Sequence, residues 1–302
     1  MWRSRLIWFI VVAGIILTGF AAWYESEHQA HTAGYSSLIS VSALVGIGVI
    51  EVVKQLRDSA KSKGRLSGQT FLEEYTTLLT NAIEALQDVH MYNEQQLYQT
   101  QTKILKLIAS VVILFYPEVE GLGINANLMQ NEPVEKHSVQ NKFHDYVYFS
   151  DPVRDASSYA SVLCVKAWAD PPQIAPHNFA LPVDKDRPRV LFGAPRTFVS
   201  GEKIVIANIH DKKEVNKKMT GQPDVVRDAV HAFFIRQKFK TFMSIAVENA
   251  DTKIAVLNVQ ADQKVFGNQT RQAEIERFIA PFCSILGIIT AQTLPVRPAP
   301  GP

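Results

Sequence analysis

The side chains best suited to chemistry in this chain of 302 residues are two cysteines and a few scattered histidines. Cys164 and Cys283 lie far apart in apolar surroundings, and no Cys-x-x-Cys or Cys/His spacing accompanies them. This pattern favours two buried free thiols in a reducing compartment over a structural zinc site. After residue 130 no two histidines have the i, i+4 spacing of a helical metal site; they are His137, His144, His177, His210 and His231. We therefore expect no metal and no cofactor.

Motifs that mark enzymes are also missing from the sequence. It contains no phosphate-binding glycine loop, no Gly-x-Gly-x-x-Gly and no nucleophile elbow. The formal net charge is only +2, and the basic clusters Lys54–Arg65 and Lys212–Lys218 carry no interleaved aromatic residues. That charge balance does not indicate a nucleic-acid polymer as partner. We expect a protein that is not an enzyme and has no catalytic residues.

Two apolar stretches near the N-terminus predict a membrane hairpin over residues 1–53. Leu6–Tyr24 contains no charge, and a helix needs about 20 apolar residues to cross a bilayer. Trp2, Trp8, Trp23 and Tyr24 lie near its ends, as interfacial aromatics do. The second stretch, Ser36–Val53, is uncharged until Glu51 and rich in small residues that let helices approach closely. A buried soluble helix is the alternative for this second stretch.

The positive charges predict how this hairpin is oriented. Arg3 and Arg5 precede the first stretch, and the cluster Lys54–Arg65 follows the second. Residues 25–35, between the stretches, contain no Lys or Arg. By the positive-inside rule, we expect a two-pass protein of the inner (plasma) membrane with both termini in the cytoplasm. A cleaved signal peptide ending near Gly19–Ala21 is the alternative for the first stretch.

Residues 54–96 are expected to hold the basic juxtamembrane segment and, after it, a helical connector. Apolar residues recur there at seven-residue spacing in two series: Leu72, Leu79 and Leu86, and Tyr75, Ala82 or Ile83, and Val89. This spacing predicts a short parallel coiled coil and hence a homodimer. A helix that packs on its own domain has the same pattern and is the alternative. Ile104–Phe115 predicts a further helix packed on a domain, because it is too short to span a bilayer.

The remaining chain alternates strand and helix patterns. We expect strands at Gly123–Met129, Ser158–Trp168 and Lys203–Ile209, then a hairpin of Thr241–Glu248 and Lys253–Ala261 around Asn249–Thr252. The hairpin strands are apolar on both faces, which is typical of central strands in a covered sheet. Helices are expected at Val225–Gln237 and Gln272–Gln292, the second with apolar residues at spacings of three and four. Residues 293–302 are expected to form a disordered Pro-rich tail.

This C-terminal part resembles a GAF domain, the small ligand-sensing fold of phosphodiesterases, phytochromes and bacterial regulators. The resemblance rests on Ser200-Gly-Glu-Lys-Ile-Val-Ile within residues 193–209, on Phe239–Glu248, and on Ile254-Ala-Val-Leu-Asn-Val-Gln-Ala followed by Phe266 and a long terminal helix. Ala246 and Ala255 stand where the family has a proline and a glycine. The resemblance implies an α+β fold, with a GAF-like antiparallel sheet flanked by helices over residues 97–292.

The resemblance also implies a ligand pocket between the sheet and its overlying loops. By family position, the residues expected near that pocket are Phe192, Arg196, Asn208, Met243 and Asn258. Their ligand is an unidentified small molecule, for which a nucleotide is one candidate.

Two functions follow as hypotheses. The first is a membrane-anchored sensor in which ligand binding or dimer rearrangement is transmitted through the Thr70–Phe115 region to the membrane helices or to a partner. Its sharper form is a nucleotide-gated membrane effector of the kind used in bacterial antiphage signalling. The alternative is a non-catalytic membrane-anchored scaffold, in which the GAF-like domain only dimerises or recruits a partner.

Overall fold

The computed structural model describes residues 68–87, 94–133, 161–171, 180–183, 192–222 and 224–292. Residues from Glu73 onward belong to one compact unit, and the description below concerns that unit. The two predicted membrane stretches and the Pro-rich tail lie outside the described residues. None of the helices in the described ranges combines the length and the apolar character that a bilayer crossing requires.

One antiparallel sheet forms the centre of the unit. Its strand order in space is β3-β2-β1-β6-β5-β4, and every neighbouring pair is antiparallel. The strands are β1 (Ile124–Pro133), β2 (Ser161–Trp168), β3 (Ala180–Val183), β4 (Ile204–Ile206), β5 (Thr241–Asn249) and β6 (Thr252–Ala261). The prediction of an antiparallel sheet is therefore confirmed, although β4 is shorter than the expected strand and β3 was not expected.

The predicted hairpin is β5 and β6, joined by a two-residue turn. Ala250 and Asp251 have φ values of 47° and 62°, and Asn249 pairs with Thr252. Two central residues with positive φ match the twist of antiparallel strands, which is why such turns close tight hairpins. Both strands have a neighbour on each side, as the apolar pattern on both of their faces predicted.

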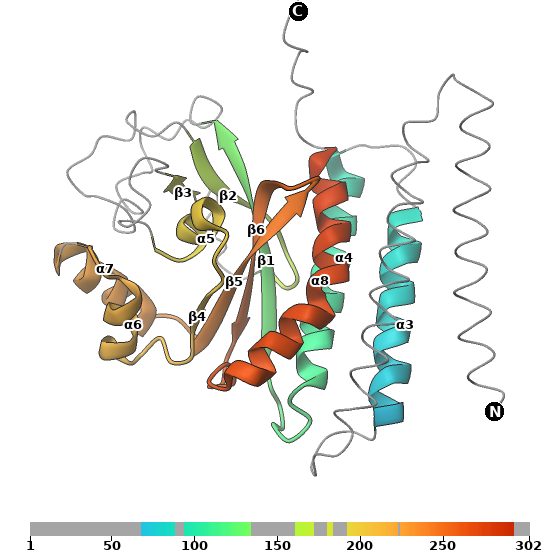
Figure 1. Ribbon diagram of the computed structural model, residues 1–302, viewed down its shortest axis with the longest axis horizontal. Helices are drawn as coiled ribbons and strands as arrows, with labels where there is room; N and C mark the ends of the chain where they lie inside the picture. The colour runs from blue at the N-terminus through green and yellow to red at the C-terminus, as the bar shows by residue number, and fades with distance from the viewer. Residues whose placement is uncertain are drawn as a thin grey trace, which may run out of the picture. The chain divides into compact units, whose positions relative to one another are not determined.

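Two long helices, α4 (Glu94–Leu114) and α8 (Gln269–Ala291), lie side by side on one face of the sheet (Figure 1). The Asn268 side chain starts α8 by accepting from the backbone N–H of Arg271 at 3.0 Å. Pro281 lies inside α8 and has no N–H to donate, and the helix changes direction along its length. Gly287 brings α8 against the backbone of β5, because a Cβ there would collide with the carbonyl oxygen of Glu248.

Three shorter helices cover the opposite face: α5 (Ala194–Ser200), α6 (Lys212–Lys218) and α7 (Asp224–Ile235) (Figure 1). α5 ends at Gly201, whose φ of 77° suits a glycine and whose N–H bonds to the Thr197 carbonyl. The Asp211 carboxylate starts α6 by accepting from two backbone N–H groups. α7 was predicted, whereas α5 and α6, each of seven residues, were not.

Helix α3 (Gly68–Gln87) contacts its own domain from Glu73 onward. The Tyr75 hydroxyl donates to the Phe278 carbonyl of α8 at 3.0 Å, and the Tyr75 ring meets the rings of Phe278 and Phe282 edge-on. Tyr75, Leu79 and Ala82 are buried. The stripe expected to form a coiled coil thus packs within the chain, and the alternative of a helix on its own domain is what the structure shows. The same heptad spacing suits either arrangement.

Candidate functional site

A row of buried polar side chains crosses the centre of the sheet on the face covered by α5. Asn127 of β1, Asn258 of β6 and Ser244 of β5 pair directly across the strands. The Ser244 hydroxyl donates to Asn258 Oδ1 at 2.6 Å, and Asn258 Nδ2 donates to Asn127 Oδ1 at 2.9 Å. Their exposed fractions are 0%, 8% and 3% for Ser244, Asn258 and Asn127. We call these three residues the polar row.

The strand geometry explains why the polar row forms. Alternate residues of a strand point to the same face, so Asn127 shares a face with Met129, and Asn258 shares one with Val256. Met129 and Val256 belong to the apolar core beneath the short helices, which places the polar row on that side of the sheet. The two amides share one hydrogen bond, in which Asn258 Nδ2 donates one proton and Asn127 Oδ1 accepts it. The amide protons of Asn127 therefore remain as donors for a partner outside the row.

Further buried polar atoms on this side have no hydrogen-bond partner in the described part of the chain, among them Oε1 and Nε2 of Gln222 between α6 and α7. Thr197 Oγ1 lies on α5, which packs on β5 and β6, and Thr197 is 0% exposed. Asn131 Oδ1 lies four residues along β1 from Asn127, and so on the same face. A buried polar atom without a partner costs about 1–3 kcal/mol. Such atoms are consistent with a bound molecule or water as the missing partner.

An aromatic cluster lies next to the polar row. Phe192, just before α5, is 2% exposed, and its ring meets those of Phe234 and Phe242 at centroid distances of 6.0 and 6.2 Å. Phe242 precedes Ser244 by two positions on the same face of β5. The side of the sheet that carries the polar row thus combines neutral hydrogen-bonding groups with apolar walls, the usual make-up of a small-molecule site.

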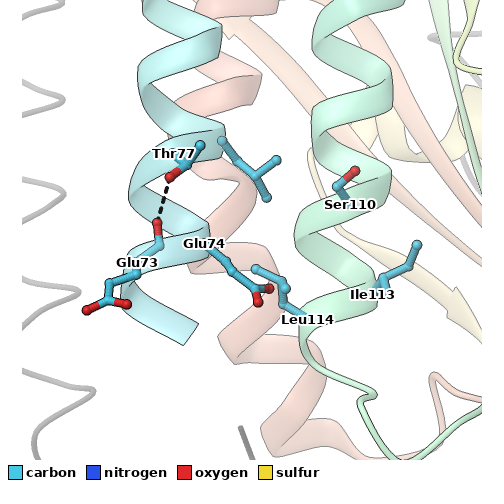
Figure 2. A pocket seen from close by; sticks show the side chains of 7 residues that line it. Glu73, Glu74, Thr77, Ser110, Ile113 and Leu114 are labelled. Atoms are coloured by element: carbon cyan, nitrogen blue, oxygen red, sulfur yellow. Dashed lines mark hydrogen bonds between the residues drawn. The ribbon is translucent and has the colours of Figure 1, made fainter. Parts of the chain in front are cut away.

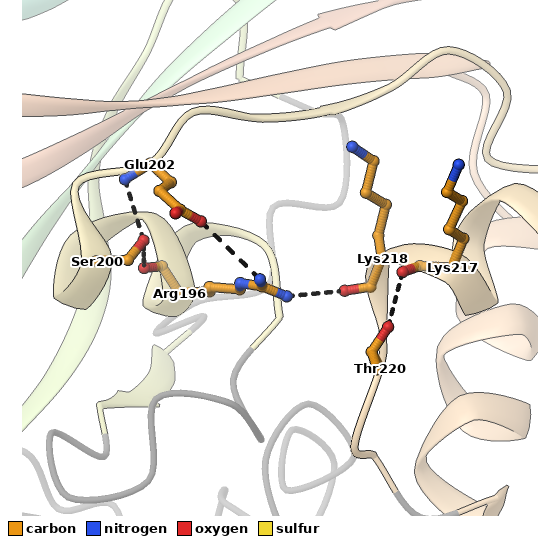
Figure 3. Close-up of polar contacts among 6 residues, drawn as sticks. All are labelled: Arg196, Ser200, Glu202, Lys217, Lys218 and Thr220. Carbon is orange, nitrogen blue, oxygen red and sulfur yellow. Dashed lines mark hydrogen bonds and ion pairs between the residues drawn. The ribbon is translucent and has the colours of Figure 1, made fainter.

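Arg196 joins α5 to the end of α6 (Figure 3). One guanidinium nitrogen donates to the Lys218 carbonyl at 3.2 Å, and another lies 3.9 Å from a carboxylate oxygen of Glu202. The Ser200 hydroxyl donates to the Arg196 carbonyl at 2.8 Å and accepts from the Glu202 N–H at 3.0 Å. Arg196 is therefore held mainly by the backbone of its surroundings, with its side chain 32% exposed at the margin of the covered face.

Asn208 and Met243 lie away from the polar row. Asn208 follows β4, where its N–H donates to the Glu214 carboxylate of α6 at 3.0 Å and its Oδ1 accepts from the His210 N–H at 3.2 Å. Met243 is fully buried, but it follows Phe242 on β5 and so points to the opposite face, toward the long helices. Of the five residues expected near a pocket, the structure brings Phe192 and Asn258 to one face and places Arg196 and Asn208 beside α6.

The sequence analysis did not single out Asn127, Ser244, Thr197 or Asn131. One signal was present, because β1 carries asparagines at 125, 127 and 131, which fall on a single face of a strand. Asparagine is depleted in strands, so its repetition on one face of a central strand indicates a polar site. Ser244 and Thr197 show no comparable pattern in the sequence. Ser244 meets Asn258 only through the register of β5 with β6.

A concave surface lies between α3 and α4, where an open groove has a volume of about 460 Å³ (Figure 2). Leu78, Ile113 and Leu114 supply its apolar surface, and Ile113 is 41% exposed. The hydroxyls of Thr77 and Ser110, also in its lining, donate to carbonyls of their own helices, at 2.9 and 3.1 Å. The other polar groups in its lining are the carboxylates of Glu73 and Glu74, so the groove is acidic and apolar, whereas the polar row is neutral.

The two cysteine thiols are poorly suited to chemistry at neutral pH. Cys164 and Cys283 are buried free thiols, as expected, and burial raises the pKa of each to about 12. A thiol with so high a pKa is a poor nucleophile and a poor metal ligand at neutral pH. In the described ranges, no three His, Cys, Asp or Glu side chains lie close enough together to hold a metal ion.

Solved structures that are similar to this chain include GAF domains, all at low sequence identity. The GAF domain of A. Aeolicus nlh2 in an inactive state is 12% identical, over 74% of this chain and 98% of that one, with a TM-score of 0.40. The GAF domain from Acinetobacter phosphoenolpyruvate-protein phosphotransferase is 10% identical, over 75% and 97%, also with a TM-score of 0.40. A methyl-accepting chemotaxis protein is 15% identical, over 66% and 98%, with a TM-score of 0.34. No family model and no curated protein matches the chain.

Proposed function

We propose that this chain is a non-enzymatic, membrane-anchored sensor that binds a small polar molecule at the polar row, beneath α5. The observation that carries the proposal is the buried line Asn127–Asn258–Ser244. On the same side, Thr197 Oγ1 and Asn131 Oδ1 have no partner among the residues that the structure describes. Three strands contribute to this line, so a molecule bound there would contact the centre of the sheet. Neutral amides and hydroxyls bind and orient a ligand, but they do not supply general acid–base chemistry at neutral pH.

The route from this site to α3 runs through α8. Ser244 and Asn258 lie on β5 and β6, and α8 packs on the other face of these two strands. The Tyr75 hydroxyl of α3 in turn bonds to the Phe278 carbonyl of α8, close to the Pro281 interruption. A ligand that binds one arrangement of the sheet better than another would bias the position of α8 and, through it, of α3.

The proposed sensor also has a membrane anchor and a second copy as partner. The uncharged stretch Leu6–Tyr24 and the weaker Ser36–Val53 support a two-pass anchor in the inner membrane, with the domain on the cytoplasmic side. We propose that the sensor works as a homodimer, through its helical connector and its GAF-like domain, and that the bilayer or a partner receives the signal. In its sharpest form, a nucleotide ligand would gate the membrane helices.

The test is a ligand screen on the full chain in detergent, with thermal unfolding as the readout. A ligand present at 100 times its dissociation constant adds about 2.7 kcal/mol of stability, which is a shift of several degrees. Nucleotides, cyclic nucleotides, amino acids and neutral metabolites are screened first. The matched variant is Asn258→Leu, which keeps the side-chain size and removes both hydrogen bonds of the row.

The two hypotheses predict different results in this screen. A sensor gives a shift with one chemical class in the native chain and a much smaller shift in Asn258→Leu. A shift that Asn258→Leu retains would place the ligand elsewhere on the chain. No shift with any class, together with intact dimers, would favour the anchored scaffold over the sensor.

A further inference from the structure

The end of α7 presents an apolar side chain to solvent. Ile235 is 72% exposed, more than the other large hydrophobic side chains that are exposed in the described ranges, Tyr98 at 43% and Ile113 at 41%. Ile235 is the last residue of α7, and its neighbour Phe234 points inward and is 3% exposed. Single exposed hydrophobic residues are common on protein surfaces, so Ile235 alone would indicate nothing.

Three exposed basic residues follow Ile235 directly in the chain: Arg236, Lys238 and Lys240. No acidic residue occurs in the sequence between Asp228 and Glu248. No ion pair involves any of the three basic side chains within the described part of the chain, although Arg236 Nε donates to the Ala232 carbonyl at 3.2 Å. Arg236 thus also caps α7, but this capping role does not account for Lys238 and Lys240.

The segment that carries these residues is held in place by the core. The Phe239 ring packs against Phe234 and Phe242, with centroid distances of 6.3 and 6.5 Å. The Lys240 N–H donates to the Ala261 carbonyl at 2.7 Å, and its carbonyl accepts from the Ile209 N–H at 2.8 Å. Because Phe239 points inward and its two neighbours outward, Lys238 and Lys240 are presented without a further loss of backbone freedom.

We propose that Ile235, Arg236, Lys238 and Lys240, here called the basic patch, dock on the surface of an anionic phospholipid bilayer. An apolar side chain flanked by exposed cations matches an interface in which the apolar group enters the boundary region and the cations meet lipid phosphates. A peptide partner is favoured less, because the groove between α3 and α4 is lined by none of the four patch residues. This proposal goes beyond ligand sensing and does not depend on a ligand in the polar row.

The test places a fluorophore at the patch of the full chain. Ile235→Cys is labelled with an environment-sensitive dye, while Cys164 and Cys283 stay unlabelled because they are buried. The chain is incorporated into vesicles of phosphatidylcholine alone or of phosphatidylcholine with phosphatidylglycerol. A blue shift is expected only with phosphatidylglycerol, and added salt should reverse it. Ser284→Cys, an exposed position on α8, serves as the control label and should stay in an aqueous environment.

Charge variants test whether the basic patch causes the blue shift on vesicles that contain phosphatidylglycerol. Each of Arg236, Lys238 and Lys240 is expected to contribute about fivefold to the docking equilibrium, so the triple change to Gln should weaken docking by roughly a hundredfold. Lys217→Gln with Lys218→Gln, a pair of exposed lysines on α6, is the matched control and should have no effect. Equal shifts in both vesicle types, no shift in either, or a shift only with an added protein or soluble polyanion would each overturn the proposal.

Discussion

His231 is a residue of α7 that faces α6, and its environment disfavours the charged imidazolium. Its Nε2 is 2.9 Å from Asn216 Oδ1 of α6, and the residue is 8% exposed. Burial is the main cause that lowers the pKa of His231, the Lys212 ammonium lowers it further, and the Asp228 carboxylate acts in the opposite direction. The unfolded chain therefore takes up this proton at a higher pH than the folded chain does.

The sign of the resulting pH dependence follows from that difference. Because the unfolded state binds the proton more readily, the folded state loses stability as the pH falls below the ordinary histidine value of 6.5. We expect His231→Gln, which can still bond to Asn216, to unfold at a temperature that depends less on pH between 7 and 5 than the native chain. Thermal unfolding across this range measures it, and the exposed His210, changed to Gln, is the control. Parallel pH profiles for native and His231→Gln chains would contradict the assignment.

At the scale of elements, α8 approaches the backbone of β5 closely at Gly287. Gly287 has no side chain to separate the helix from the Glu248 carbonyl, and an added Cβ would meet both this oxygen and the side chain of Val247. The collision is with backbone, which cannot rotate away, so either α8 or the end of β5 must move. Such overpacking costs about 1–3 kcal/mol.

Gly287→Ala is accordingly expected to lower the free energy of unfolding by about 1–3 kcal/mol. Gly267→Ala is the matched control, because a Cβ at Gly267 meets nothing within 4 Å. Denaturant unfolding of the native chain and both variants measures these free energies of unfolding. Equal stability of the two would show that α8 adjusts its position on β5 without cost.

The sequence predicted the elements that have long, regular patterns. The turn at Asn249–Thr252, the apolar residues on both faces of β5 and β6, and the apolar spacing of α8 were sufficient to predict these elements and their types. β3, α5 and α6 have seven residues or fewer, too short for periodicity to show. The heptad spacing of α3 predicted a helix but not the surface that the helix contacts. Periodicity does not tell whether an apolar stripe packs on a second chain or on the domain that follows it.

The candidate site was predicted less completely than the fold. Phe192 and Asn258 were named by resemblance and share the covered face, whereas Met243 turns to the other face of the same sheet. The polar row depends on register, since Asn127 meets Asn258 only because β1 pairs with β6 in one alignment. A register between distant strands is set by the whole fold and cannot be read from either strand alone.

For the whole molecule, the structure predicts an uneven distribution of local stability. The strands β1, β6 and β5 lie inside the sheet; β5 and β6 contact α8 on one face and α5 on the other, and β1 contacts α4. α6 and α7 lie on the outer side, and much of their surface, including Lys217, Lys218 and Ile235, is exposed. Local opening takes less free energy where few buried contacts are broken.

Native-state hydrogen exchange is expected to follow this order. The amides of β6 should exchange slowest, those of β1 and β5 next, and those of α6 and α7 fastest among the described elements. Mass spectrometry of peptides from each element measures the rates. Protection of α6 and α7 equal to that of β6 would mean that the domain opens only as one cooperative unit. A ligand at the polar row should slow exchange chiefly in the three central strands.

The pairing of β1 with β6 also sets a condition on how the protein is made. The side chains of Asn127 and Asn258 bond across a separation of 131 residues, so β1 leaves the ribosome long before its partner exists. At about 5–20 residues per second, the wait is on the order of 10 s. During this time the edge of β1 that later pairs with β6 exposes unpaired backbone groups on a chain that is still being translated, which is a risk for aggregation. The domain is therefore expected to depend on chaperones that hold nascent chains until β6 and α8 have emerged.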